Sequence, residues 1–80
     1  MLVSRSLHPM KVQVIEAMHW IGRPLASSDL CRVFEDTYEL ALIDYHVKKL
    51  AKLGALRRDG TEKVRGAMKY YYVLVELSDW

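Results

Sequence analysis

Apolar residues recur at helical spacing at the start of the chain and predict an opening helix. In the segment HPMKVQVIEAMHWIG, helical spacing is followed by Val12, Ile15, Met18 and Gly22, with Val14 and Ile21 widening the stripe. Pro9 suits the first position of a helix, because the N–H that it lacks would have no partner there. A glycine and a proline follow the segment and favour an end, so we expect a helix at about 9–21.

The next pattern, LASSDLCRVFE, predicts a second and shorter helix. Ser27 or Ser28 can cap its first turn, and Asp29 would then face the positive end of the helix dipole. The inward side chains of this helix are expected to be those of Leu30, Val33 and Phe34.

A third helical pattern runs from about Glu39 to Leu53 and has two unlike faces. At about 100° per residue, its apolar face collects Leu40, Ile43, Val47 and Leu50. The opposite face carries Ala41, Leu42, Tyr45, Lys48, Lys49 and Lys52, with Asp44 at its flank. A face that serves solubility alone would usually mix the two signs of charge, and this one holds no acidic residue. Gly54 suits the position after the helix end, where a left-handed conformation favours glycine.

After this helix the pattern changes from helical to extended. ALRR is a candidate for a short strand, and KYYYVLVEL is rich in the aromatic and β-branched residues that strands favour. The segment DGTEKVRGAM, residues 59–68, holds two glycines and no apolar periodicity, so we expect a loop there. The chain thus predicts an α+β fold of three helices followed by a two-stranded hairpin, in a single domain over 1–80.

The net charge of the chain is only +2, but its distribution is uneven. Residues 45–69 contain eight basic residues and two acidic ones, a local surplus of six positive charges. This asymmetry favours a polyanionic partner for the second half of the chain. A lysine face that is merely solvated is the simpler alternative.

The sequence also argues against several classes of protein. It has no apolar run of the roughly 18–20 residues that span a bilayer, and its first ten residues do not form a secretory signal. Cys31 is the only cysteine, so no disulfide can form within the chain. We therefore expect a cytoplasmic protein that does not associate with membranes.

No motif for catalysis or metal binding is present. His8, His19, His46 and Cys31 lack the spacing of metal ligands, and His46 favours a structural or phosphate-contacting role. There is no Ser/His/Asp order, no phosphate-cradling glycine loop and no convergent pair of carboxylates. We expect no enzymatic activity, no metal and no cofactor.

Four segments, HPMKVQVIEAM, DLCRVF, YHVKKLAKLGAL and RGAMKYYYVL, follow one another in an order that resembles the winged helix-turn-helix of ArsR-type transcriptional regulators. The resemblance covers about residues 7–75. In that family a His-Pro opens the first helix, the third helix ends in Gly-Leu, and a basic wing precedes a Tyr-Tyr-x-Leu strand. It implies that the third helix lies in the major groove of DNA, with the wing, residues 59–68, on the backbone or in the minor groove.

The resemblance also implies roles for individual residues. The base-facing candidates are Ala41, Leu42, Tyr45 and Asp44. Contacts to the phosphate backbone are implied for Lys48, Lys49, Lys52, Lys63 and Arg65. Arg65 is also the best candidate for a narrow minor groove, which favours arginine.

The chain departs from the family at several positions. Ala41 and Leu42 stand where the family usually has serine or threonine, so this face can contact a thymine methyl group or a protein. The cysteines of metal-sensing members would fall at Ala26 and Ser28, so sensing of metals through thiolates is not expected. The turn EDTY also makes the connection before the third helix about two residues longer than in the family.

Two questions about partners stay open at the level of sequence. A winged-helix module that binds protein and not DNA would use Ala41, Leu42 and Tyr45 as its contact surface. A homodimer through the first helix would use the residue types enriched at interfaces, at Met10, Met18 and Trp20. The alternative for these three side chains is the core or the rim of a small domain.

Overall fold

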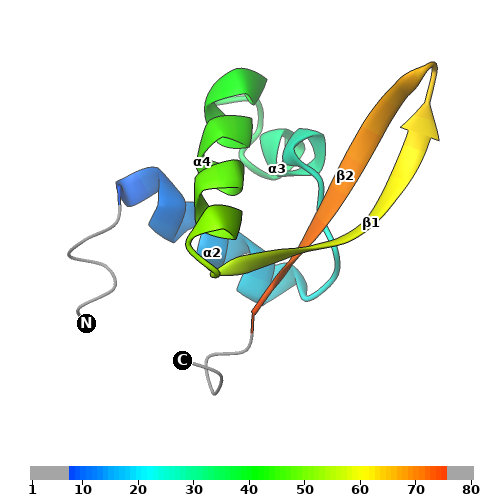
Figure 1. Cartoon of the computed structure of the whole chain (residues 1–80). Helices are drawn as coiled ribbons and strands as arrows, with labels where there is room; N and C mark the ends of the chain where they lie inside the picture. The colour runs from blue at the N-terminus through cyan, green and yellow to red at the C-terminus, as the bar shows by residue number, and fades with distance from the viewer. Residues whose placement is uncertain (1–7, 76–80) are drawn as a thin grey trace.

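The computed structural model describes residues 8–75, and they form three helices followed by an antiparallel two-stranded hairpin (Figure 1). The elements are α2 (Pro9–Ile21), α3 (Ser27–Val33), α4 (Leu40–Lys52), β1 (Leu56–Val64) and β2 (Ala67–Leu74). The predicted α+β class and the order of its elements are confirmed. The first and third helices lie within one residue of their predicted bounds.

Helix α2 begins as its sequence predicts but buries only part of the predicted stripe. Pro9 is its first residue, and the ring nitrogen Nδ1 of His8 accepts a hydrogen bond of 3.1 Å from the backbone N–H of Met10. Its buried side chains are Met10, Val14 and Met18. The predicted stripe through Val12 and Ile15 is only half-buried, because apolar residues on adjacent positions of this helix allow several stripes of equal spacing.

The start of α3 corrects the predicted cap. Ala26, and not Ser27 or Ser28, precedes the first turn, and its backbone N–H donates to the Asp29 carboxylate at 2.9 Å. Ser27 is buried and its hydroxyl donates to Oδ1 of Asp44 in α4, at 2.8 Å. A serine at this position therefore joins two helices, which is a tertiary role that local capping rules do not predict.

Helix α3 ends in a left-handed turn that contains no glycine. Glu35 and Asp36 have φ values of 54° and 58°. Their N–H groups donate to the carbonyls of Arg32, at 2.9 Å, and Cys31, at 2.8 Å, in the pattern of a Schellman motif. Non-glycine residues in this conformation cost about 1–2 kcal/mol each, so the connection to α4 is strained.

The core lies between the three helices and the base of the hairpin. Its side chains without exposed surface come from every helix and from the connection before α3, namely Val14, Leu25, Leu30, Ile43, Val47 and Leu50. Two predicted inward residues, Val33 and Leu40, are exposed instead. Val33 is the last residue of α3 and Leu40 the first of α4, positions that periodicity assigns to the core but that no other element covers.

The C-terminal end of α4 turns the chain into the hairpin. Gly54 has φ 87°, as its predicted place after the helix end requires. Its N–H donates to the carbonyl of Ala51 at 3.1 Å, and the N–H of Ala55 donates to that of Leu50 at 2.9 Å. This second Schellman motif sets the direction in which β1 leaves the helix.

The predicted loop at 59–68 is wrong, because both strands continue through it. Only Arg65 and Gly66 form the turn, with φ values of 50° and 83°, as in a type I′ hairpin. A bulge at Asp59 and Gly60 shifts the register between Arg58 and Thr61. All residues of β1 after Leu56 are exposed, so neither face of the strand is buried. The strand therefore lacks the alternation of apolar and polar residues by which strands are recognised in a sequence.

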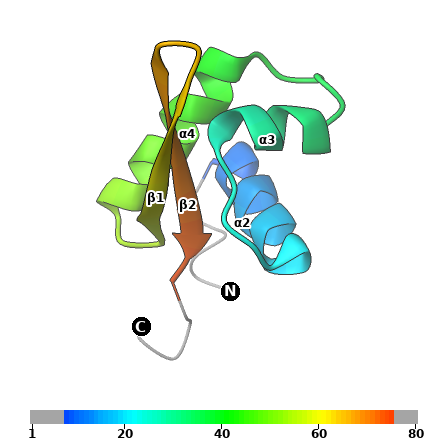
Figure 2. The ribbon, with the colours of Figure 1, turned by 90° about the vertical axis from the view of Figure 1, so that its right-hand side faces the viewer.

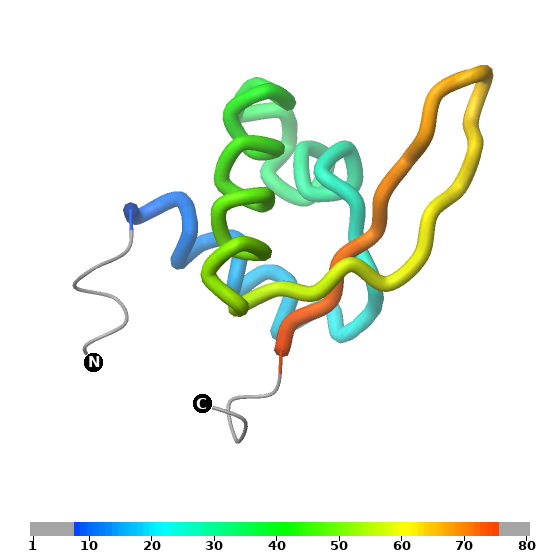
Figure 3. The backbone as a smooth tube through the Cα atoms, viewed as in Figure 1, coloured from blue at the N-terminus to red at the C-terminus, as the bar shows by residue number. Residues whose placement is uncertain are grey.

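The base of the hairpin is tied to the helical part, where β2 runs beside the connection between α2 and α3 (Figure 2), and its tip extends away from the helices (Figure 3). Leu25 and Tyr72 exchange two backbone hydrogen bonds of 3.0 and 2.9 Å, which fix β2 against the connection between α2 and α3. None of the helices within residues 8–75 has the length and apolar character needed to cross a lipid bilayer.

Candidate nucleic-acid interface

The outward face of α4 is exposed along its whole length. The six side chains predicted to lie there, Ala41, Leu42, Tyr45, Lys48, Lys49 and Lys52, are all exposed. Tyr45 is 54% exposed and lies beside two ammonium groups, with Nζ of Lys49 at 5.5 Å and Nζ of Lys11 at 5.9 Å from its ring centre. These contacts, and the edge-on ring of His46 at 5.2 Å, hold an aromatic side chain in a basic environment.

Asp44, at the flank of this face, is already engaged within the protein. Its carboxylate accepts hydrogen bonds from the hydroxyl of Ser27 and from Nζ of Lys48, each at 2.8 Å. Partial burial alone would raise the pKa of Asp44, but the bonds from Lys48 and Ser27 lower it below its ordinary value. In turn, the hydrogen bond and the charge of Asp44 raise the pKa of Lys48. The expectation that no acid opposes the lysines of this helix is therefore wrong for Lys48.

The hairpin adds further cations beside α4. Lys63 and Arg65, predicted as wing contacts, are exposed, as are Arg57 and Arg58. Within the described residues, six cations between positions 45 and 69 have no carboxylate within 4 Å, and these are Lys49, Lys52, Arg57, Arg58, Lys63 and Arg65. The surplus of positive charge seen in the sequence is thus gathered on α4 and the hairpin, two elements that are in contact.

Lys69 uses its charge differently and anchors the hairpin to α3. Its Nζ donates to Oδ1 of Asp29 at 3.2 Å, and both side chains are mostly buried. Burial alone would raise the pKa of Asp29, but bonds from the backbone of Ala26 and from Lys69 lower it overall. On the same strand, the hydroxyl of Tyr71 donates to Glu62 at 2.8 Å. The first of these contacts ties the hairpin to α3, and the second joins its two strands.

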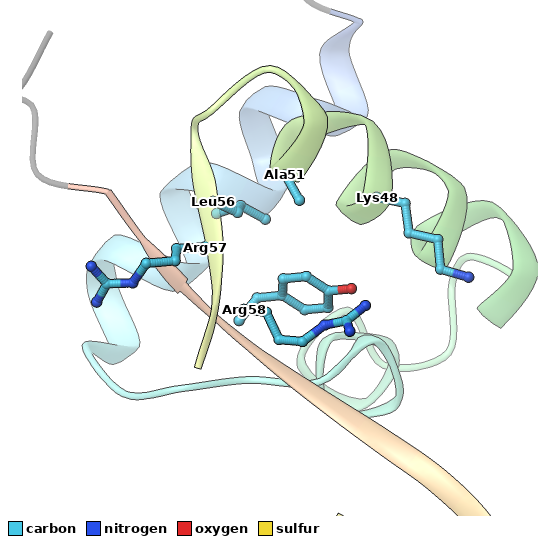
Figure 4. Close-up of a pocket in the computed structure, with 6 residues that line it drawn as sticks. Lys48, Ala51, Leu56, Arg57 and Arg58 are labelled. Atoms are coloured by element: carbon cyan, nitrogen blue, oxygen red, sulfur yellow. The ribbon is translucent and has the colours of Figure 1, made fainter. Parts of the chain in front are cut away.

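Arg57 and Arg58 were not among the residues singled out from the sequence. The guanidinium of Arg58 lies 4.2 Å from the ring centre of Tyr70 and 5.9 Å from that of Tyr72. Both arginines line an open hollow of about 470 Å³ between α4 and the hairpin (Figure 4). The charge count included them, but a short strand candidate gave no indication of which face each would occupy.

His8, His46 and Cys31 have structural positions, whereas His19 is exposed. His46 is buried, stacks on His8 at 4.8 Å, and its Nδ1 lies 2.9 Å from Nζ of Lys11. Burial, and then the charges of Lys11 and His8, lower the pKa of His46. Cys31 is half-buried, and burial raises the pKa of its thiol. No group of three potential metal ligands comes together in the part of the chain from His8 to Val75.

Two of the three side chains predicted for a dimer contact are not available for one. Met10 and Met18 are buried in the core of the single chain. Trp20 is 86% exposed at the C-terminal end of α2 and is the only one of the three that a second molecule could reach.

The described surface thus combines an exposed helix face, a neighbouring basic hairpin and a hollow between them. Of the nine residues singled out from the sequence, eight are exposed on α4 and the hairpin, and Asp44 is half-buried and ion-paired. The sequence of the chain matches no protein-family model, and it matches no curated protein.

Proposed function

We propose that this chain is a small DNA-binding regulator of transcription with a winged helix-turn-helix fold. Helix α4 would enter the major groove, and the hairpin would lie along the adjacent backbone or in the minor groove as the wing. The order of three helices and a hairpin is compatible with this fold, and the resemblance to ArsR-type regulators points to the same arrangement.

The observation that carries the proposal is the set of six cations without carboxylate partners on α4 and the hairpin. A duplex presents two parallel rows of phosphates, and cations on two adjoining elements can contact both sides of a groove. With 13 residues, α4 is about 20 Å long, and the diameter of a helix, about 10–12 Å, fits the major groove. Lys49 and Lys52 would contact phosphates from the helix, and Lys63 and Arg65 would do so from the hairpin.

Base contacts would come from the exposed apolar and aromatic side chains of α4. Ala41 and Leu42 suit the methyl group of thymine, and Tyr45 can reach a base edge from the centre of the face. Asp44 is a poor candidate for a base contact, because Ser27 and Lys48 already occupy its carboxylate.

One such domain would bind duplex DNA weakly, in the nonspecific range of about 10⁻⁴–10⁻⁶ M at physiological salt. A dimer that reads two half-sites about 10 base pairs apart, or a multiple of that spacing, would gain specificity. If the chain pairs through α2, Trp20 is the side chain that would carry the contact.

The proposal is tested by titrating a fluorescent duplex of about 20 base pairs with the purified chain at several salt concentrations. Binding should weaken steeply between about 50 and 200 mM salt, because each phosphate contact releases counterions. Lys49→Ala and Lys52→Ala should each weaken binding to every duplex and lower the salt slope by about one unit. Arg23→Ala, an exposed arginine between α2 and α3, is the matched control and should leave both unchanged. Equal binding by all three variants and the wild type would refute the assignment of this face.

The second candidate is a winged-helix module that binds a protein partner through α4. It is favoured by the exposed apolar side chains of this region, since Leu42 is 42%, Tyr45 54% and Leu53 65% exposed. Binding to a protein that does not change with salt, together with no binding to any duplex, would select this candidate.

A further inference from the structure

The hollow between α4 and the hairpin is lined mainly by basic and aromatic side chains. Its walls are formed by Lys48, Ala51, Leu56, Arg57, Arg58 and Tyr72. Lys48 extends from α4 and Arg58 from β1 toward the same side of the hollow, whereas Arg57 extends away from it (Figure 4). Among the described residues that line it, three of six are cations and none is a carboxylate, so the hollow favours an anion.

Tyr72 presents a hydroxyl group that no other described residue uses. The side chains of Tyr38 and Tyr71 donate hydrogen bonds to Gln13 and Glu62, at 3.0 and 2.8 Å. Tyr72 is only 3% exposed, yet its hydroxyl has no hydrogen-bond partner within residues 8–75. Since no fully buried polar side-chain atom in this part of the chain lacks a partner, that hydroxyl keeps some exposed surface, and Tyr72 is one of the residues that line the hollow. This tyrosine can therefore offer a hydroxyl donor to a basic hollow.

Arg58 is held in place without losing its hydrogen-bond donors. Its guanidinium stacks on Tyr70 at 4.2 Å and lies opposite Tyr72 in the strand register. Stacking uses the face of the group and leaves the N–H donors at its edge free to bind an oxyanion in a fork. No carboxylate in the described chain lies within ion-pair distance of Arg58.

Lys48 forms the opposite wall and is the weaker of the two cations. One of its N–H donors is taken by Asp44 at 2.8 Å, and its side chain is otherwise mostly exposed. Asp44 therefore orients the ammonium group but also lowers the positive potential of the hollow. Apart from Arg57, the local balance is two positive charges against one negative.

We propose that this hollow is an oxyanion site that takes one phosphate group, with Arg58, Lys48 and the hydroxyl of Tyr72 as its donors. A hollow of about 470 Å³ that is open on one side accepts a phosphate still attached to a larger molecule. If that phosphate belongs to a duplex, the inference rests on the proposed function. The inference then states where one backbone phosphate would be held, namely between α4 and β1. A free phosphate compound would be bound by the same chemistry.

The test uses inorganic pyrophosphate titrated at low salt into the ¹⁵N-labelled full chain, with amide chemical shifts as the readout. Saturable shifts are expected at the residues that line the hollow. Tyr72→Phe removes only the hydroxyl and should weaken pyrophosphate binding about fivefold, as the loss of one hydrogen bond predicts. Tyr71→Phe is the matched control, because its hydroxyl is bound to Glu62, and it should leave the affinity unchanged.

Two further variants change the charge of the hollow in opposite directions. Arg58→Gln should weaken pyrophosphate binding at least about tenfold, and Arg58→Lys should restore only part of the loss because it lacks the planar fork. Asp44→Asn keeps an acceptor for Ser27 but removes the negative charge, and it should strengthen binding about fivefold. This gain cannot result from unfolding, so it separates a binding role from a structural one. Shifts that do not saturate, or that are equal in every variant, would overturn the oxyanion site.

The same variants, titrated with the fluorescent duplex, separate this inference from the proposed function. Weaker duplex binding by Tyr72→Phe and Arg58→Gln, with no change in Tyr71→Phe, supports a backbone phosphate in the hollow. Saturable pyrophosphate binding without any duplex binding would support the oxyanion site and refute the proposed function. Duplex binding that is the same in Tyr72→Phe, Arg58→Gln and the wild type would refute the phosphate in the hollow and leave the proposed function standing.

Discussion

Replacing Arg65 with asparagine should stabilise the hairpin and weaken DNA binding at the same time. Arg65 has φ 50° and Gly66 has φ 83°, so both residues of the two-residue turn adopt the left-handed conformation of a type I′ hairpin. Asn-Gly is the preferred pair for this turn, whereas a residue such as arginine has a steric cost of about 1 kcal/mol or more there. The arginine thus opposes the geometry of its own turn.

The size of each effect follows from the turn and from the charge. Relief of about 0.5–1 kcal/mol at the turn would slow local opening of the hairpin about two- to fivefold. Loss of one phosphate contact lowers the salt slope by about 0.9. If the two proteins bind equally when extrapolated to about 1 M salt, the variant should therefore bind a duplex about eightfold more weakly than the wild type at about 0.1 M. The two effects have opposite signs, so neither can be the cause of the other.

Hydrogen exchange of the amides of Val64 and Ala67, which pair beside the turn, measures the first effect. Salt-titrated duplex binding measures the second, and Arg65→Lys, which keeps the charge, is the control for it. Faster exchange in Arg65→Asn would contradict the account of the turn. Unchanged affinity and slope in that variant would show that the tip of the hairpin does not contact DNA.

Three further predictions concern stability. The pKa of His46 is lowered in the folded chain, so the unfolded chain binds the proton more tightly, and the free energy of unfolding should fall as the pH drops from about 7.5 to about 5.5. Urea titrations of the wild type and His46→Gln check this, and an equal fall in both would contradict it. The pKa values of Asp29 and Asp44 are lowered from an ordinary value of 3.8, so these two carboxylates change the free energy of unfolding only at more acidic pH. Glu35→Gly should stabilise the chain by about 0.5 kcal/mol in the same assay. Glycine relieves the strain of the left-handed conformation, but part of this gain is offset because glycine has more conformational entropy in the unfolded chain; a loss of stability would exclude the strain at Glu35. Leu50→Ala should lower the free energy of unfolding by about 2–5 kcal/mol. Leu53→Ala, at an exposed position just past the end of the same helix, should change it by about 0.5 kcal/mol or less, and similar losses in the two variants would argue against the packing described for α4.

The helices could be predicted because their signals are local. Pro9 at the start of α2 and Gly54 after the end of α4 act through their own backbone, and a helix that buries one face repeats its apolar residues regardless of its partner. The hairpin was predicted only in part, because β1 is exposed on both faces beyond Leu56 and its residues carry no alternation. Its length and its turn follow from pairing with β2, to which the sequence of β1 alone gives no guide.

The candidate interface shows the same division. The exposure of Tyr45 and of the lysines of α4 followed from helical periodicity. The engagement of Asp44 by Ser27, 17 residues away, did not, because it depends on how α3 packs against α4. The opposition of Lys48 and Arg58 across one hollow depends likewise on the turn after α4 and on the register of the hairpin.

From the sequence alone, one can derive the order of the helices, the bounds of the first and third, the presence of a hairpin and the concentration of basic residues in the second half of the chain. Each of these depends on neighbours within a few positions, where backbone geometry and side-chain type are sufficient. Packing between elements, in contrast, sets which apolar stripe of α2 is buried, which cations are neutralised by carboxylates, and which donors converge on one hollow. Such features join residues far apart in the chain, and their distances are set by packing between elements.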